Sequence, residues 1–493
     1  GFRSAVAAFS PQRHFQGRTT EVKRTRGRAK VSIFAAAGLA AALVAGCTTG
    51  GGQGVSPANT PDAYDITVWI TDTLPDRVER MQAIAADFTA ATGLKAELIR
   101  VPEHEFNQTL TSSAAAGNLP DVIGAISLGN VRTLAASKYV NPEANAAVIK
   151  NLGEKTWSQR SLELTRDRGR QLAVPAASWQ QVLYYRKDLF AQAGLAAPTT
   201  YGRILAAAKK LHTPQLAGFV AANKAGQPFT QQSFEHIAQG NGCELVSAQG
   251  AITFDSPQCV GALGFYSDML KNYSVPGAQD VGTVRSAYFA GSAAMAVWPT
   301  FMLDELAGLR NDARPSCREC KLDPGFLVRN TGVVAGIQGH GDATPAHFGE
   351  ISSWTVTSDS DTDPARKFVE HLLGDGYTNW LSAAPDERIP VRSGTAARPS
   401  EYADAWRAMP VGVGKREPLA KFYSADVLSV LLDGVKDLSH WGILQGRGDL
   451  AGAAMAELPI AEAVGEVTAG TADARTAASK AAGTLRSILR SLR

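Results

Sequence analysis

Residue types that carry out catalysis are present in this chain, but they do not fall into the spacings of common hydrolytic sites. The sequence has no G-x-S-x-G motif around a serine nucleophile and no S-x-x-K pair. His104-Glu105 continues as Phe-Asn-Gln, so the second histidine of a zinc protease helix is missing. Carboxylate pairs for glycoside hydrolysis meet only in the folded chain, which leaves that alternative open. We therefore expect no enzyme, no metal and no cofactor.

The basic residues gather at the start of the chain and indicate an export signal. Residues 1–46 hold eight of the 49 Lys and Arg residues and one of the 46 Asp and Glu residues, which leaves a net charge of −4 on the rest. A mildly acidic body argues against nucleic-acid binding, which depends on neutralising phosphates. The basic stretch at 23–30 precedes an apolar run at 31–46 that is too short to span a membrane and is typical of a signal peptide. Residues 1–22 are expected to be an upstream extension.

Cys47 follows the apolar run directly, and Val44-Ala45-Gly46-Cys47 resembles the bacterial lipoprotein box. In that motif the thiol is lipidated and the cysteine becomes the new N-terminus, so we expect a palmitate-bearing lipid anchor at Cys47. The alternative is a signal anchor with an incidental cysteine. Residues 47–62 are rich in Gly, Thr and Pro and predict a flexible tether. The body would then be exported and held at the outer face of the bacterial cytoplasmic membrane.

Four cysteines remain: Cys243, Cys259, Cys317 and Cys320. An even number in an oxidising compartment favours two disulfides, and the spacing favours the local pairs Cys243–Cys259 and Cys317–Cys320. A four-cysteine zinc site or a redox-active C-x-x-C motif are the alternatives. Zinc would need a second closely spaced pair, which the sequence lacks.

The elements that must position a site begin as an α/β pattern. A chain of 493 residues, 45% of them hydrophobic, is too long for one ordinary core and predicts at least two lobes. Strands are expected at 66–70, 94–101 and 121–126, and helices at 76–92 and 105–116, with Gly93 ending the first helix. Strand–helix–strand units of this spacing imply a parallel sheet with ligands near the strand C-termini. Further on we expect extended segments at 172–175 and 182–185, helices at 198–211 and after the N-cap Asp363, and a helical tail from Thr471.

Six blocks in order resemble the carbohydrate-binding family of extracellular solute-binding proteins of bacterial ABC importers, which includes the maltose-binding protein. The blocks are ITVW (66–69), AAAGNLPDVI (114–123), LYYRKDLFAQAGLAAPTTY (183–201), AYFAGSAAMAVWPTF (287–301), ISSWTVTSDSDTDPARKFVEHLL (351–373) and RIPVR (388–392). The resemblance extends from about residue 65 to residue 449, which is most of the exported chain.

The resemblance implies a two-lobed α/β fold of the type II periplasmic-binding-protein class, with hinge-linked lobes and a ligand cleft. It places crossings between the lobes near 176–179, 346–352 and 384–390. The N-lobe would comprise 63–177 plus 349–385, and the C-lobe 178–348 plus 386–493. It also implies a monomer that captures a sugar or oligosaccharide by closing the cleft and delivers it to the ABC permease subunits in the membrane.

Sugar recognition needs flat aromatic side chains against the apolar ring faces and polar groups in the plane of the hydroxyls. The resemblance places aromatic platforms at Phe229 and Trp298, a further aromatic at Tyr423, and polar groups in the loops after the first and third strands. Trp179 stands at the first crossing, where the maltose binder has a carboxylate, so specificity for malto-oligosaccharides is not implied. Core packing is the alternative role for each aromatic, and helix capping is the alternative for Asp72. The expected ligand residues are Asp72, Thr73, Ser127, Trp179, Gln227, Phe229, Trp298, Ser353, Trp354 and Tyr423.

Three other functions compete with sugar import. A binder of the same fold could take a non-sugar solute such as a glycerol phosphate diester or a polyamine. The expected ligand positions are mostly aromatic and neutral, whereas a phosphate would call for clustered arginines. A secreted glycoside hydrolase and a lipoprotein that senses or scaffolds are the remaining alternatives.

Overall fold

The computed structural model describes residues 64–492. The expected upstream extension, signal peptide, lipidated Cys47 and tether therefore lie outside the described residues. None of the helices within 64–492 combines the length and the apolar composition that crossing a bilayer requires.

The chain starts with three parallel strands, as the strand–helix–strand spacing predicts. β1 (Ile66–Ile70) lies between β2 (Ala96–Arg100) and β3 (Val122–Ile126), and both pairings are parallel. α1 (Pro75–Thr92) and α2 (Phe106–Ala115) connect these strands. Gly93 ends α1 in the left-handed region, at φ 76°, and its N–H donates to the Thr89 carbonyl. Parallel strands end at the same edge of a sheet, so the loops after β1 and β3 face the same way.

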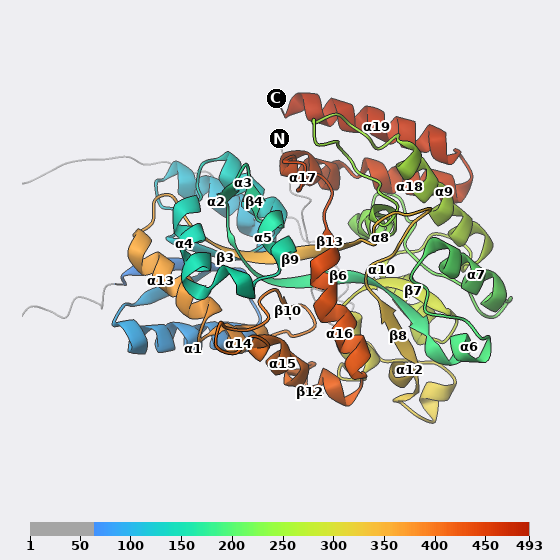
Figure 1. Ribbon diagram of the computed structural model, residues 1–493, viewed down its shortest axis with the longest axis horizontal. Coiled ribbons are helices and arrows are strands. Elements are labelled where there is room, and N and C mark those ends of the chain that lie inside the picture. The colour runs from blue at the N-terminus through green and yellow to red at the C-terminus, as the bar shows by residue number, and fades with distance from the viewer. Residues whose placement is uncertain (1–63, 493) are drawn as a thin grey trace, which may run out of the picture. The chain divides into compact units, whose positions relative to one another are not determined.

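The long strand β6 (Val174–Arg186) joins two groups of strands (Figure 1). Its first half, up to Gln180, pairs antiparallel with β9 (His347–Val356), and its second half pairs with β7 (Met295–Pro299) and β8 (Thr331–Val334). We call β1, β2, β3 and the β9-paired half of β6 the first strand group. We call β7, β8 and the other half of β6 the second strand group. The two extended segments expected at 172–175 and 182–185 are thus parts of one strand.

The sheet is mixed, in the order β10-β6-β9-β3-β1-β2, with β7 and β8 on β6 and β13 on β9. β9 pairs antiparallel with both β3 and β6. Short strands complete the set: β10 (Ile389–Pro390) and β13 (Leu438–Ser439) in the main sheet, and the separate pairs β4 (Arg166–Asp167) with β5 (Arg170–Gln171) and β11 (Pro410–Val411) with β12 (Glu417–Pro418).

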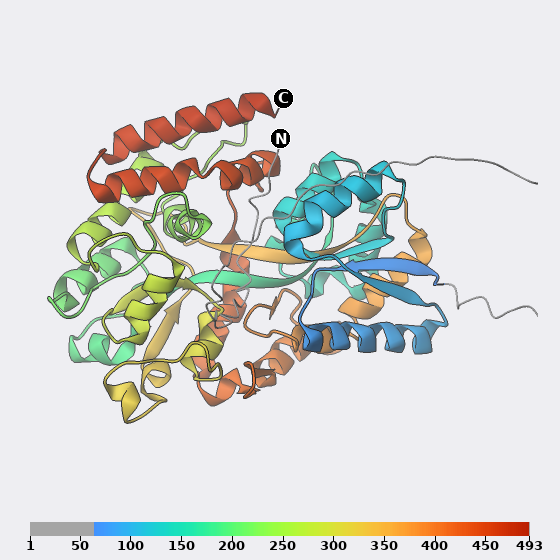
Figure 2. The same cartoon turned by 180° about the vertical axis from the view of Figure 1, so that it is seen from behind.

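Helices flank both strand groups (Figure 2). Those on the chain between β3 and β7 are α3 (Leu128–Ala136), α4 (Pro142–Leu152), α5 (Gln159–Leu164), α6 (Lys187–Gln192), α7 (Tyr201–Leu211), α8 (Pro228–Gln239), α9 (Pro257–Asn272) and α10 (Val281–Phe289). The later ones are α11 (Met302–Leu306), α12 (Phe326–Arg329), α13 (Thr362–Leu373), α14 (Tyr377–Leu381), α15 (Glu401–Ala408), α16 (Ala425–Gly434), α17 (Gly448–Glu457), α18 (Pro459–Ala469) and α19 (Ala474–Ser491).

The start of α13 differs from the expectation. Its N-cap is Asp361, and the expected N-cap Asp363 lies inside the first turn, where it forms an ion pair with Arg366. The backbone N–H of Asp361 donates to the carboxylate of Asp121 at 2.7 Å, and this tertiary bond anchors the helix start two residues earlier.

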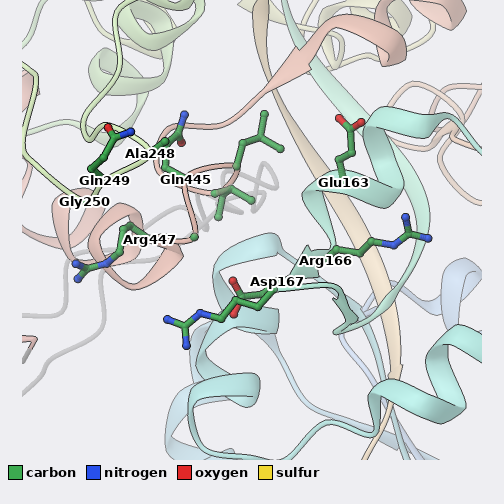
Figure 3. A pocket seen from close by; sticks show the side chains of 12 residues that line it. Glu163, Arg166, Asp167, Ala248, Gln249, Gly250, Gln445 and Arg447 are labelled. Atoms are coloured by element: carbon green, nitrogen blue, oxygen red, sulfur yellow. The ribbon is translucent and has the colours of Figure 1, made fainter.

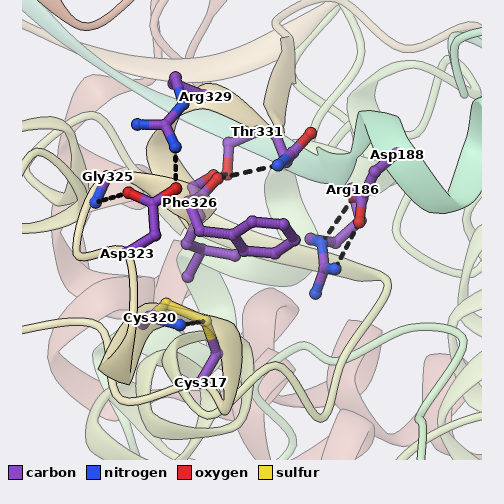
Figure 4. The surroundings of a disulfide bond; sticks show 11 residues. Arg186, Asp188, Cys317, Cys320, Asp323, Gly325, Phe326, Arg329 and Thr331 are labelled. Atoms are coloured by element: carbon purple, nitrogen blue, oxygen red, sulfur yellow. Dashed lines mark hydrogen bonds and ion pairs between the residues drawn. A yellow bond between two sulfur atoms is a disulfide. The ribbon is translucent and has the colours of Figure 1, made fainter.

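Two disulfides link the pairs that the spacing favours, Cys243–Cys259 and Cys317–Cys320. The first ties the segment after α8 to the first turn of α9. The second closes a tight turn before α12, in which the Cys320 N–H also donates to the Cys317 sulfur at 3.0 Å (Figure 4). Each of the four cysteines is in one of these two disulfides, so none of them is available as a zinc ligand.

Candidate functional site

An aromatic cluster occupies the middle of the crossing strands, where the two strand groups meet. The Trp179 ring of β6 lies 5.2 Å from the ring of Phe301, which follows β7, and 5.5 Å from the ring of Phe348 on β9. The His440 ring, just after β13, lies 5.2 Å from Phe348. Trp179 is buried, with 8% of the residue exposed. Of the expected ligand residues, Trp179 is the one on β6, the strand whose two halves pair in different strand groups.

A carboxylate lies beside this cluster on the neighbouring strand. Glu350 of β9 is directly opposite Trp179 in the antiparallel ladder. Its Oε1 accepts hydrogen bonds from the backbone N–H groups of Leu128 at 2.8 Å and Ile351 at 3.1 Å. Its Oε2 lies 3.8 Å from Nε2 of His440. The carboxylate is therefore bonded to the start of α3 and lies near the chain that follows β13.

His440 lies between two carboxyl groups. Its Nδ1 is 3.9 Å from Oε1 of Glu235, which is on α8 and is fully enclosed. Glu235 accepts hydrogen bonds from the Trp441 N–H at 2.7 Å and from the Gln239 side chain at 2.8 Å. Burial raises the pKa of Glu235 well above its usual value and lowers the pKa of His440 to about 4. At neutral pH the imidazole is then neutral and can donate one hydrogen bond and accept another.

Ser127 has the structural role of an N-cap. Its hydroxyl accepts a hydrogen bond from the Asn130 N–H at 3.2 Å at the start of α3, directly before Leu128. The side chain is nevertheless not sealed, since Ser127 is 9% exposed. The structure thus places Ser127 one residue from the backbone donor that holds Glu350.

Asp72 does not cap α1, whose N-cap is Leu74 without a side-chain hydrogen bond. Its carboxylate accepts a hydrogen bond at 2.7 Å from Arg388, which directly precedes β10, and Nη1 of Arg77 lies 3.9 Å away. The guanidinium of Arg388 also lies 4.3 Å from the centre of the Trp380 ring and donates to the Trp380 carbonyl. Asp72 is therefore fixed by an enclosed ion pair, while Thr73 beside it is exposed.

Phe229 and Trp298 come together in the second strand group. Their ring centroids are 6.2 Å apart in an edge-to-face arrangement. The Trp298 Nε1–H donates to the Val281 carbonyl at 3.0 Å, and the guanidinium of Arg285 lies 5.8 Å from the ring centre. Both rings are nearly enclosed, and Gln227, half-buried, forms the N-cap position of α8 without a side-chain hydrogen bond there.

Three other expected ligand residues occupy packed positions. Ser353 and Trp354 are buried in β9 between β3 and β6, and the Trp354 ring covers Gly124 so closely that a Cβ there has no space. Tyr423 is buried, and its hydroxyl donates to the Leu303 carbonyl at 2.7 Å. Ligand contact by these three residues stays a prediction.

A buried acidic pair lies near the same junction. Asp304 of α11 and Asp386, before β10, are both enclosed. Burial, opposed by Arg310 and assisted by Glu305, raises the pKa of Asp304 to about 7. Burial and the proximity of Asp304 raise the pKa of Asp386 well above its usual value. Both groups therefore favour the protonated form when the chain is folded.

A separate cavity of about 840 Å³ contains none of the expected ligand residues (Figure 3). One side comes from α5 and the β4–β5 hairpin, and the other from residues 248–250 and 443–447. Two of its three arginines are engaged locally, because Arg166 binds Gln171 and Glu154, and Arg447 binds Asp449. Since no aromatic residue lines it, the cavity lacks a stacking surface for a sugar ring.

Four residues around Trp179 were not predicted from the sequence: Glu350, His440, Phe301 and Phe348. The signal for Glu350 is an acid inside HFGEISSW, an otherwise apolar or small-residue strand in which it shares a face with Phe348. His440 follows a two-residue strand, for which periodicity gives no signal.

Within residues 64–492 no group of three or more His, Cys, Asp or Glu side chains is arranged to hold a metal ion. Aromatic faces next to a few fixed polar groups are suited to binding a ligand.

Comparison with known proteins gives relatives of one kind. YcjN of Escherichia coli (strain K12), named as an ABC transporter periplasmic-binding protein, is 28% identical over 306 residues, 61% of this chain and 66% of its own length. A mannitol-binding protein of Pseudomonas aeruginosa is 30% identical over 135 residues, 27% of this chain and 31% of its own length. The chain thus spans less than two thirds of the length of these curated relatives.

The fold is shared with solved structures. The crystal structure of a cyclic alpha-maltosyl-1,6-maltose binding protein from Arthrobacter globiformis covers 86% of this chain and 99% of its own, with a TM-score of 0.65 and 18% identity. This likeness supports the expected two-lobed α/β fold. The family model for bacterial extracellular solute-binding proteins matches residues 72–379, more than half of the chain. The chain therefore belongs to the family of bacterial extracellular solute-binding proteins, which are binding proteins rather than enzymes.

Proposed function

We propose that this protein is the substrate-binding component of a carbohydrate ABC importer. It captures a sugar or oligosaccharide between its two lobes and delivers it to the permease subunits in the membrane. The observation that carries the proposal is the Trp179 cluster. It places an aromatic face on β6, the strand that pairs in both strand groups, beside a carboxylate on the neighbouring β9 that is bonded to the start of α3.

The proposed mechanism is ligand-driven closure. The lobes would comprise 63–177 plus 349–385 and 178–348 plus 386–493, and they would rotate about the crossings at β6, β9 and the segment before β10. A ligand that touches both lobes stabilises the closed state by its differential affinity for the two states. The permease would then bind the closed form.

The exported protein would be a monomer, anchored through a lipid on Cys47 at the outer face of the cytoplasmic membrane. A lipid chain and a flexible tether would keep the binding lobes close to the permease. Labelling with a radioactive fatty acid tests this anchor. We expect the label to be incorporated into the wild type and not into Cys47→Ser.

A second candidate ligand is a polyamine, because a carboxyl group, Glu350, lies opposite Trp179 in the strand ladder. Asp304 and Asp386 form a separate enclosed acidic pair, and carboxylates attract cations. Uncharged sugars remain the first proposal, since the aromatic cluster offers flat faces and burial favours the neutral form of both aspartates.

A thermal-shift screen separates these ligands. The panel contains mono- to tetrasaccharides, mannitol and ribitol, with spermidine and glycerol phosphate diesters as the competing classes. A ligand at 100 times its Kd adds about 2.7 kcal/mol to the free energy of unfolding, which raises Tm measurably. We expect a shift with at least one sugar or polyol. A shift with spermidine or a phosphodiester alone would contradict the proposal, and release of a new reducing end would indicate a hydrolase.

A further inference from the structure

The cavity that contains none of the expected sugar-binding residues has the size of a small-molecule site. Its volume is about 840 Å³, within the range of roughly 300–1,000 Å³ that such sites occupy. Two separate parts of the chain form its walls (Figure 3). One wall is α5 with the β4–β5 hairpin, and the other combines residues 248–250 with the segment 443–447 after β13. A ligand in this cavity can therefore touch both walls.

Five charged residues line the cavity, and four of them are compensated by ion pairs. These pairs are Glu163 with Arg160, Arg166 with Glu154, Asp167 with Arg132, and Arg447 with Asp449. The fifth charged residue is Arg168. Among residues 64–492, no ion pair or side-chain hydrogen bond engages its guanidinium. Since each of the four pairs is neutral, Arg168 leaves one uncompensated positive charge on the cavity.

Arg168 also has a backbone conformation that arginine rarely adopts. Arg168 and Gly169 form the two-residue turn between β4 and β5, with φ of 48° and 78°. A turn of this kind needs left-handed backbone at both residues, and Asn-Gly is the preferred pair. Residues held in this region at a cost in free energy cluster at ligand sites. The Arg168 side chain is exposed and lines the cavity, which fits such a role.

We propose that this cavity binds a small oxyanion, a carboxylate or a phosphate, through the guanidinium of Arg168. A guanidinium offers a planar pair of N–H donors that matches two oxygens of either group. The side chains of Gln249 and Gln445 also line the cavity, and amide groups can donate further hydrogen bonds to the same ligand. The inference goes beyond the proposed sugar binding, because Trp179 and the other expected sugar ligands do not line this cavity.

The test is isothermal titration of the full chain in a chloride buffer, with inorganic phosphate and succinate as separate probes. The two probes distinguish a phosphate site from a carboxylate site. The main variant is Arg168→Asn, which removes the guanidinium and places a favoured residue in the turn. Its Tm without ligand should therefore equal or exceed that of the wild type. Arg170→Gln is the matched control, since Arg170 lies in the same hairpin, is exposed and does not line the cavity.

We expect phosphate, succinate or both to bind the wild type, and Arg168→Asn to bind the same probe at least tenfold more weakly. Arg170→Gln should bind like the wild type, although it loses the same charge. Arg168→Lys should have an intermediate affinity, because it keeps the charge and loses the planar pair of donors. Added sodium chloride should weaken binding to the wild type, since Arg168 is exposed to solvent.

Two results overturn the inference. If neither phosphate nor succinate binds the wild type, the cavity is not an oxyanion site. If Arg168→Asn and Arg170→Gln bind the probe with equal affinity, Arg168 does not contact it. Both results leave the proposed sugar binding untouched, because the sugar screen uses neither probe and Arg168 is not an expected sugar ligand.

Discussion

At the scale of single residues, the enclosed guanidinium of Arg388 shows how buried charge is compensated near the site. Its partners are the carboxylate of Asp72, the carbonyl of Trp380 and the face of the Trp380 ring. Taking a charge out of water costs several kcal/mol, and these contacts offset that cost. The loop after β1 is therefore fixed by a residue more than 300 positions later in the chain.

Replacing Arg388 should destabilise the protein. Arg388→Met keeps much of the volume but leaves Asp72 with only Arg77, 3.9 Å away. We expect the free energy of unfolding, measured by urea denaturation, to fall by about 3 kcal/mol. Arg486→Met, which breaks the more exposed pair with Asp255, should cost less than about 1 kcal/mol. An equal loss of unfolding free energy in the two variants would contradict the conclusion that Arg388 compensates the buried charge of Asp72.

Trp179 and Trp157 are a matched pair of tryptophans for testing the binding surface. Both are nearly buried, but Trp157 lies away from the cluster and donates its Nε1–H to the Pro175 carbonyl. Leucine at either position should lower Tm, because each change removes a large packed ring. Only Trp179→Leu should also weaken sugar binding, at least tenfold by isothermal titration. Similar binding by the two variants would remove Trp179 from the site.

At the scale of elements, α11 and the segment before β10 bring two acids together. The pKa of Asp304 is raised to about 7, from an ordinary value near 4, because the side chain is buried. A carboxyl whose folded pKa is raised makes its full contribution to stability below its unfolded pKa. That contribution is lost as the pH rises through the folded pKa.

The contribution of Asp304 to the free energy of unfolding should therefore fall between about pH 4 and pH 7, by up to about 1.4 kcal/mol per pH unit. Asp304→Asn should reduce this fall, as measured by urea denaturation across the range. Asp363→Asn is the control, since the pKa of this exposed carboxyl is lowered by Lys367 and Arg366. Identical pH profiles of stability for the wild type and Asp304→Asn would contradict the raised pKa of Asp304.

Local sequence signals predicted the early elements well. Alternation and helical spacing located β1, α1, β2, α2 and β3, and Gly93 ends α1 as expected. The long β6 was predicted as two fragments, because a strand buried along its length lacks the polar alternation of a half-exposed one. The predicted start of the helix at 362–373 was two residues too late, because a bond to the distant Asp121 anchors the N-cap at Asp361.

The candidate site was less predictable, because its residues meet only through the strand register. Phe229 and Trp298 were each expected as an aromatic platform for the ligand, which stays a prediction, and the structure places their ring centroids 6.2 Å apart. Glu350 and His440 become neighbours of Trp179 because β9 pairs with β6 and β13 pairs with β9. A sequence read segment by segment contains no information on that pairing.

At the scale of the whole molecule, β6 is the continuous strand that pairs in both strand groups, and β9 runs beside its first half. Strands that pair along their length stay intact while the groups at their ends rotate, so the crossings can act as hinges. Small-angle scattering should show a smaller radius of gyration when a binding sugar is added. Trp179→Leu, at the same sugar concentration, should show little change. A wild-type scattering curve that is unchanged at saturating sugar would contradict closure.

The central claim, that a sugar binds on Trp179 between the two strand groups, is tested most directly by a crystal structure with the tightest-binding saccharide. We predict density for the sugar against the Trp179 ring, with further contacts to residues of both strand groups. Density only in the cavity between Arg166 and Gln445, or away from Trp179, would contradict the claim.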